Sequence, residues 1–300
     1  MAVPGDTTPR AIPGFTRNQA LRKATFISRP NRFLVVVRTG GGPDSDHPAT
    51  VAKSALRGPG DNSTNDEKTN GREVTVHVAD SARMEELLVL GRTVYLAPVG
   101  SWSDPEGPST ATDPTSVGSP VARSLTRSPR KTACDLVLVD FNGTLVSIDS
   151  RVPNKVMSEA LRMGFFKELE AYPTVISESR HGESRLDFRL SGPDREDCLV
   201  EVKSVTLVQK GRALFPDAPT ALGARHMREL IGAVAEGLRA LAVFIVQRED
   251  ARAFSPNDAT DPEFGRTLRE AARAGVGVWA YTCDVTTDAV RLGRRIPVIL

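Results

Sequence analysis

The sequence predicts an α+β protein of two domains, a small β-barrel followed by an α/β sandwich with a mixed central sheet. Two observations predict this order. Residues 29–148 contain five short strand patterns and one short helix pattern, whereas residues 149–300 alternate strands with amphipathic helices. A chain of 300 residues is long enough for two such domains, each with its own hydrophobic core.

The barrel is predicted from its strand patterns and turns. Asn142-Gly143 is a strong signal for a tight hairpin. A short helix is expected at Ala82–Val89, closed by Gly91. Five short strands with a single helix are typical of an OB-type barrel. The strands are expected at Arg32–Arg38, Glu73–Val78, Thr93–Ala97, Asp135–Phe141 and Thr144–Ile148.

Three segments of the first half lack the pattern of a folded element. Residues 1–28 have no sustained periodicity and are expected to be disordered. Residues from about 40–71 and 101–133 are rich in glycine and polar side chains, which have little to bury. These two segments are predicted to be low-complexity insertions between barrel strands.

The second domain is predicted to begin at about Asp149. Pro153 suits the first turn of a helix, and Asp261-Pro262 starts another helix, because a capping carboxylate precedes the proline. Between these helices the patterns indicate two strands joined by a turn, then a long helix and a strand that is apolar on both faces. These elements are expected at Arg185–Leu190, Cys198–Val208, Thr220–Leu238 and Leu241–Val246, with a last strand at Val276–Tyr281.

Polar side chains of the two turn-linked strands are predicted to meet. Glu201 and Lys203 project from one face of an alternating strand, and the hairpin brings Asp187 close to both. Two carboxylates and a lysine can hold Mg²⁺ against a phosphate and activate a water. The pattern therefore indicates a metal-dependent phosphodiesterase. The alternative is a solvated strand face with a cross-strand ion pair.

Two further residues are candidates for this chemistry. Glu159, on the first helix of the second domain, is a third candidate metal ligand, with an exposed helix charge as the alternative. Gln247 follows the buried strand, where it could order a metal-coordinated water; a polar strand end is the alternative.

Basic residues near this site are candidates for phosphate binding. Arg225, His226 and Arg228 lie off the apolar stripe of the long helix and are expected to form a phosphate-binding face. Arg248, at the end of the buried strand, is a further candidate. An ordinary solvated helix face and a polar strand end are the alternatives.

Composition narrows the class of protein. The 39 basic and 37 acidic side chains leave a net charge of +2, so any nucleic-acid surface must be a local patch. The three cysteines lie far apart and are expected to be reduced. No apolar run is long enough to span a membrane, and no secretory signal is evident, so a cytoplasmic protein without membrane contact is expected.

Several segments, in order along the chain, resemble the sugar fermentation stimulation protein A family. The likeness covers about residues 29–39, 72–99 and 134–299. The segments that carry it are Arg185–Leu190, Val200–Leu207, Leu214–Ala218, Gly223–Leu230 and Val243–Asp250, with Pro30–Phe33, Val76–Met84 and Val152–Asn154 upstream.

The resemblance implies an N-terminal OB-type domain, a C-terminal restriction-endonuclease-like domain of the PD-(D/E)XK type, and DNA binding with a regulatory role in sugar metabolism. It also implies DNA contacts by Arg32, His77, Arg83 and Asn154. The sequence departs from the family pattern after the second strand, where Ala79 and Ala82 replace the usual proline and glycine. The two insertions also fall between barrel strands.

The sequence thus predicts a DNA-binding protein whose second domain is a Mg²⁺-dependent nuclease, with Mn²⁺ as a substitute metal. Asp187 and Glu201 are expected to ligate the metal with help from Glu159, and Lys203 to activate water or stabilise the phosphate. The alternatives are a non-catalytic DNA-binding regulator of sugar metabolism genes and a metal-free module that binds another protein. A homodimer is compatible with the sequence.

Overall fold

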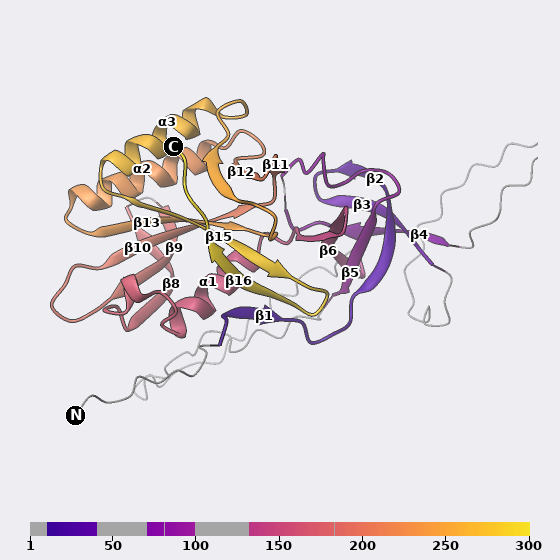
Figure 1. Ribbon diagram of the computed structural model, residues 1–300, viewed down its shortest axis with the longest axis horizontal. Helices are drawn as coiled ribbons and strands as arrows, with labels where there is room; N and C mark the ends of the chain where they lie inside the picture. Colours follow the sequence, from indigo (N-terminus) through magenta and orange to yellow (C-terminus); the bar gives the residue numbers. More distant parts are fainter. Residues whose placement is uncertain (1–10, 41–70, 81, 100–131, 183) are drawn as a thin grey trace, which may run out of the picture.

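The structure, a computed structural model, describes residues 11–40, 71–80, 82–99, 132–182 and 184–300, and all statements below concern these residues. They form two domains that lie side by side (Figure 1). A β-barrel contains strands β2–β7, and an α/β sandwich contains the remaining strands and the helices.

Five strands of the first domain close into a barrel, and a sixth extends it. The order is β4-β3-β2-β5-β6-β7, and a parallel pairing of His77 with Asp135 closes β4 on β6. Fully buried valines such as Val35, Val37 and Val94 fill the interior. The predicted OB-type barrel is confirmed. Its strands are β2 (Arg22–Asn31), β3 (Leu34–Thr39), β4 (Arg72–His77), β5 (Thr93–Pro98), β6 (Cys134–Phe141) and β7 (Thr144–Ser147).

Two parts of the barrel differ from the prediction. β2 lies outside the predicted strands because only Ala24 and Phe26 are buried along its ten residues, which leaves little alternation in the sequence. The predicted helix at Ala82–Val89 is wrong. Met84 has a positive φ of 51°, which no right-handed helix allows, and its carbonyl accepts hydrogen bonds from two successive turn amides. Met84 and Leu87 are instead fully buried in the barrel core.

The two predicted insertions fall mostly outside the described residues, as do residues 1–10 of the segment expected to be disordered.

The second domain is built on a mixed seven-stranded sheet. Its order is β1-β16-β15-β13-β10-β9-β8, in which β10, β13 and β15 are parallel and the outer pairs antiparallel. This agrees with the predicted α/β sandwich. The strands are β1 (Gly14–Thr16), β8 (Thr174–His181), β9 (Ser184–Ser191), β10 (Cys198–Val205), β13 (Arg239–Val246), β15 (Gly277–Val285) and β16 (Ala289–Arg295). A smaller sheet contains β11 (Val208–Gln209), β12 (Arg212–Phe215) and β14 (Ala253–Pro256).

Helices cover both faces of the large sheet (Figure 1). The first helix, α1 (Val152–Arg162), and the short 3₁₀ helix η1 (Lys167–Leu169) pack on one face. The other face carries α2 (Ala221–Ala235) and α3 (Pro262–Arg273). Asp261 caps α3 as predicted, since its Oδ1 accepts a hydrogen bond from the Phe264 amide at 2.9 Å.

The alternation of β10 decides which side chains face which helices. Val200 and Val202 contribute to the core on the α1 face, whereas Leu199 and Val205 contribute to the core beneath α2 and α3. Since neighbouring residues of a strand point to opposite faces, Glu201 must share the face of Leu199. Glu201 and Lys203 therefore project toward α2.

The N-terminal segment belongs to the second domain, which corrects part of the expected disorder over residues 1–28. β1 adds an edge strand to the large sheet by antiparallel pairing of Gly14 with Arg291 and of Thr16 with Ala289. Arg17 then donates hydrogen bonds from Nη1 to the carbonyls of two residues in the loop between β15 and β16. The chain starts on one domain and crosses to the other to begin the barrel.

Hydrogen bonds and ring contacts connect the domains at the end of β13. Ser147 of β7 donates from its amide to the Gln247 carbonyl at 2.9 Å and from Oγ to Gln247 Oε1 at 2.7 Å. The Arg248 guanidinium lies 4.7 Å from the centre of the Phe141 ring. Because Gln247 and Arg248 are almost fully buried, these contacts hold the barrel against the sandwich.

The cysteines and the lengths of the helices can be compared with the sequence-based expectations. Cys134, Cys198 and Cys283 are free thiols, as predicted. No helix in the described part of the chain is long and apolar enough to cross a membrane.

Candidate metal centre and nucleic-acid surface

The candidate metal centre forms where β9 separates from β10. The two strands pair from Phe188 to Leu190 and diverge at the next residue, Asp187. Its carboxylate fills the gap: Oδ2 accepts a hydrogen bond from the Val202 amide at 2.7 Å, and Oδ1 accepts one from Asn154 Nδ2 at 2.6 Å. The carboxylate is thus fixed between the sheet and α1.

Glu201 and Lys203 meet on the α2 side of the same strand. Lys203 Nζ donates a hydrogen bond to Glu201 Oε1 at 2.6 Å. His226 of α2 contacts the same carboxylate oxygen through Nδ1, and this nitrogen lies 3.1 Å from Lys203 Nζ. Glu201 is only 3% exposed. Two side chains, one from β10 and one from α2, therefore fix the orientation of the Glu201 carboxylate.

The two carboxylates have opposite pKa shifts. Burial and the neighbouring charge of Glu201 raise the pKa of Asp187 to about 6. Burial alone would raise the pKa of Glu201 too, but hydrogen bonds from His226 and Lys203 outweigh it and lower this pKa. Glu201 therefore ionises more readily than Asp187. The ionised form of Asp187 is destabilised by burial and by the charge of Glu201.

The second carboxylate oxygen of Glu201, Oε2, indicates whether these residues could bind a cation. Glu201 Oε2 is buried and has no hydrogen-bond partner among the described residues. An ionised oxygen in that state costs free energy unless a positive charge lies beside it. Burial and the charge of Glu201 also raise the pKa of the neighbouring Asp187 carboxyl, so a cation would stabilise its ionised form as well. Hard oxygen ligands with excess negative charge fit a Mg²⁺-type ion.

Glu159 is not part of this arrangement. It lies five residues after Asn154 on α1, which places it about 140° around the helix from the side chain that contacts Asp187. No group of three or more His, Cys, Asp or Glu side chains suited to a metal occurs in the ranges that the structure describes. The expected third carboxylate ligand is therefore missing from the cluster.

Gln247 and Arg248 also lie away from the centre. Gln247 follows Val246, whose side chain packs beneath α2 and α3, so Gln247 points to the opposite face from Glu201. Its Nε2 donates to Ser204 Oγ at 2.9 Å, on the α1 side. Arg248 is 1% exposed and ion-paired with Asp250 at 2.6 Å. Both residues join the domains in this structure, so neither side chain is positioned for its predicted role in ordering water or binding phosphate.

The predicted basic face of α2 separates into three different environments. Arg225 is exposed, as a phosphate contact requires. Arg228 is exposed but forms an ion pair with Glu263 of α3. His226 is buried and contacts Glu201 of the candidate metal centre rather than forming part of a surface. A signal for its inward position exists in the sequence, because Leu230, four residues later on the same face of the helix, is an apolar core residue.

The predicted contacts of the barrel lie at different places. Arg32 is exposed in the turn between β2 and β3. Arg29 brings it together with Arg83, because the Arg29 guanidinium donates to the carbonyls of both residues. His77 is elsewhere, with Nδ1 3.3 Å from Asp135 Oδ1.

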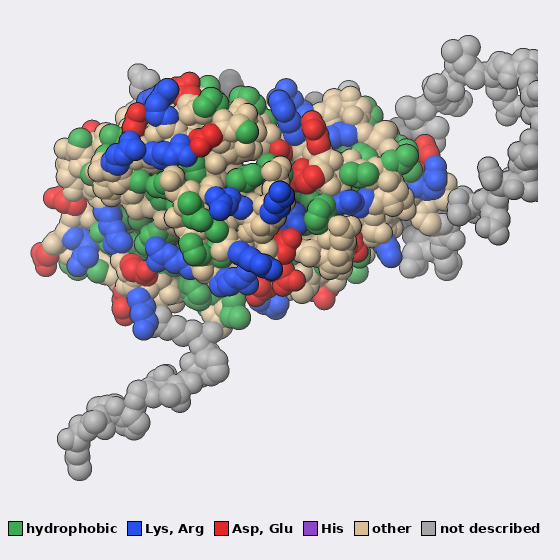
Figure 2. Space-filling model, turned by 45° about the horizontal axis from the view of Figure 1, so that its top comes forward, with side chains coloured by type: hydrophobic (Ala, Val, Ile, Leu, Met, Phe, Trp, Pro, Cys, Tyr) green, Lys and Arg blue, Asp and Glu red, His purple; other side chains and the backbone are tan. Residues whose placement is uncertain are grey.

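Charge on the visible surface is mixed. Figure 2 shows Lys and Arg side chains interspersed with Asp and Glu over one face of the molecule. This agrees with the small net charge of +2. A nucleic-acid contact on this face would therefore depend on individual basic residues rather than on a uniformly positive surface.

Comparisons with known proteins match both domains. The family model described as the sugar fermentation stimulation protein RE domain matches residues 151–289, and the model of the SfsA N-terminal OB domain matches residues 27–111.

Similar full-length proteins carry the same family name. A sugar fermentation stimulation protein homolog of Moorella thermoacetica is 42% identical over 280 residues, which cover 93% of this chain and 96% of the relative. A homolog of Symbiobacterium thermophilum is 42% identical over 284 residues, 93% of this chain and 94% of the relative. Among solved structures, that of Pyrococcus furiosus SfsA in complex with Ca²⁺ has a similar fold, with a TM-score of 0.71 at 23% identity, and covers 97% of this chain and 100% of that chain.

Proposed function

The chain belongs to the sugar fermentation stimulation protein family, and on this basis we propose that it is a Mg²⁺-dependent phosphodiesterase that cleaves DNA. The observation that carries the proposal is that Asp187 lies close enough to Glu201 and Lys203 to interact with their charges, where β9 leaves β10. Glu201 Oε2 is buried there and has no hydrogen-bond partner among the described residues. A structural ion pair alone does not account for that oxygen, because the lysine contacts only Oε1.

Asp187 and Glu201 would hold the metal. The Val202 amide and Asn154 keep the Asp187 carboxylate in place, and His226 does the same for Glu201. When bound, Mg²⁺ would polarise the scissile phosphate and lower the pKa of a coordinated water. The solved Pyrococcus furiosus relative is described as a complex with Ca²⁺, an ion with the same preference for oxygen ligands.

Lys203 would contribute positive charge toward the phosphate. Its side chain is 12% exposed beside the buried carboxylate, and a phosphate oxygen would approach it through this opening. A charge held in this fixed position stabilises the additional negative charge of a pentavalent phosphate without reorganisation. The expected division of labour is metal binding by the two acids and transition-state stabilisation by the lysine.

The test is to incubate the purified protein with labelled single- and double-stranded DNA and RNA in Mg²⁺, Mn²⁺ or EDTA. Lys203→Ala and Asp187→Asn are compared with Lys167→Ala, an exposed lysine on η1 that serves as the control. Cleavage of DNA that requires metal, is lost in the first two variants and persists in the control supports the nuclease. If every DNA stays intact while all four proteins bind it with the same salt dependence, the nuclease proposal is wrong and a DNA-binding regulator remains.

A further inference from the structure

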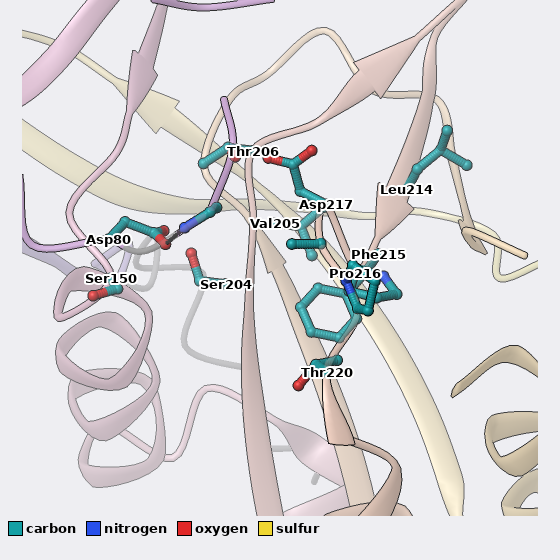
Figure 3. A pocket seen from close by; sticks show the side chains of 13 residues that line it. Asp80, Ser150, Ser204, Val205, Thr206, Leu214, Phe215, Pro216, Asp217 and Thr220 are labelled. Carbon is teal, nitrogen blue, oxygen red and sulfur yellow. Dashed lines mark hydrogen bonds between the residues drawn. The ribbon is translucent and has the colours of Figure 1, made fainter. Parts of the chain in front are cut away.

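A cavity lies between the barrel and the second domain, at the end of β10. Its volume is about 250 Å³. Asp80 and Ser150 line it on one side, and Phe215 and Asp217 on the other (Figure 3). Val205, which also lines the cavity, lies two residues after Lys203 on the same face of β10. The cavity therefore begins about 7 Å along the strand from the lysine of the proposed metal centre, because a strand advances about 3.3 Å per residue.

Two carboxylates, which only accept hydrogen bonds when ionised, line this cavity together with serine and threonine hydroxyls. Asp80 Oδ1 accepts from the Ala82 amide at 2.8 Å, and Asp217 Oδ2 accepts from the Met84 amide at 2.7 Å. The second oxygen of each carboxylate has no partner among the described residues. Arg29 lies close enough to both carboxylates to interact with their charges, but its Nη atoms are occupied by backbone carbonyls.

Apolar surface completes the cavity. The Phe215 ring is held by edge contacts with Phe244 and Phe264, at centroid distances of 5.6 and 5.0 Å. Pro216 and Leu214 continue the apolar side. A small planar group with hydrogen-bond donors on its edge matches such a lining, because apolar walls contact its faces while a carboxylate accepts from its edge.

We propose that this cavity binds one unpaired guanine of the nucleic acid, beside the scissile phosphate; the proposal rests on the nuclease function proposed above. Guanine presents two adjacent donors, N1–H and the N2 amino group, which the two oxygens of a carboxylate can accept together, because the oxygen that holds a backbone amide keeps a second acceptor site. Adenine and cytosine place an acceptor next to their amino group, and thymine and uracil have carbonyls on both sides of their N–H. Drug-sized ligands need about 300–1,000 Å³, so a cavity of about 250 Å³ suits one base rather than a base pair.

Asp217→Asn provides a specific test, because the hydrogen bond from the Met84 amide determines which end of the new side chain faces the cavity. The Met84 amide needs an acceptor and should hold the asparagine carbonyl, which leaves the amide NH₂ facing the cavity. The amide NH₂ group of the variant would then face the N1–H and N2 donors of guanine. Guanine should therefore no longer bind more tightly than the other bases. Asp258→Asn is the matched control, since Asp258 is an exposed acid paired with Arg269 of α3.

Fluorescence anisotropy measures binding of single-stranded oligothymidylates that carry one central guanine, hypoxanthine, adenine or cytosine, in EDTA to prevent cleavage. The wild type and the control should bind the guanine oligonucleotide about tenfold tighter than the others or better. Hypoxanthine lacks the N2 amino group and should lose most of this advantage. Asp217→Asn should bind all four alike. Equal affinity of the wild type for all four, or no binding, overturns the proposal.

Adding Mg²⁺ to the same oligonucleotides separates this proposal from the nuclease function. Guanine-selective binding without cleavage supports the base pocket and rejects the nuclease. Metal-dependent cleavage at the same rate beside any base, with no selectivity in binding, rejects the pocket and leaves the nuclease standing. Cleavage concentrated next to guanine in the wild type, and redistributed in Asp217→Asn, supports both.

Discussion

Asp187→Asn should stabilise the metal-free protein while abolishing its response to metal. The pKa of Asp187 is raised from its ordinary value of 3.8 to about 6 in the folded chain. Ionising this acid therefore costs folded-state stability: the cost is absent below pH 3.8, grows with rising pH and is complete above about pH 6. A difference of about two pH units corresponds to about 3 kcal/mol. Since the side chain is partly accessible to solvent, we expect about 2 kcal/mol at pH 7.5.

Asparagine can keep the local contacts of Asp187. Its carbonyl can accept from the Val202 amide, and rotation of the Asn154 amide lets that side chain accept from the new NH₂ group. The gain in stability should therefore not be cancelled by a lost hydrogen bond.

Urea unfolding in EDTA at pH 7.5 and pH 4 measures this effect, with Asp258→Asn as the control. The gain of about 2 kcal/mol should shrink to a few tenths at pH 4, and the control should show no gain at either pH. Millimolar Mg²⁺ should raise the unfolding free energy of the wild type but not of Asp187→Asn. A variant that is less stable than the wild type at pH 7.5, or equally stabilised at both pH values, refutes the electrostatic reasoning.

The remaining predictions concern other contacts. His226→Phe removes the ring nitrogen between the glutamate and the lysine, and should reduce metal affinity by about 10- to 100-fold in calorimetric titration; unchanged affinity contradicts its positioning role. Gln247→Leu breaks the side-chain hydrogen bonds to Ser147 and Ser204 and should lower the unfolding free energy by about 1–3 kcal/mol, and a double-mutant cycle with Ser147→Ala should show coupling. Additive effects would show that the pair does not act together. Asp261→Ala loses the cap of α3 and should cost about 1–2 kcal/mol in thermal unfolding, whereas Asp261→Asn should cost less.

Sequence patterns indicate that Asp187, Glu201 and Lys203 lie near one another, because these residues are close in the chain. Asp187 and Glu201 belong to neighbouring strands joined by a short turn, so alternation and hairpin geometry together place them. The position of His226 depends on how α2 packs on the sheet, and its charge-rich neighbours suggest an exposed face. Helical periodicity relative to Leu230 is the stronger signal for this residue.

Long-range packing explains the failures. Gln247 follows an all-apolar strand, and such a strand gives no alternation from which to read which face a following residue will occupy. Met84 and Leu87 have the spacing of a helix, but the barrel core uses them in a turn. β16 carries three arginines and a glycine in seven residues, so its strand character comes from its pairing with β15.

The position of β1 links the two ends of the chain in folding. Gly14 pairs with Arg291, so the outer edge of the large sheet joins segments at nearly opposite ends of the sequence. Such a contact has a high loop-closure cost and raises the contact order. During synthesis the barrel can form first, while β1 must wait until the last strand has left the ribosome. A fragment that begins at α1 would also expose the bare edge of β16, which invites pairing with other chains. The second domain is therefore expected to fold and to remain monodisperse only when residues 11–20 are attached to it.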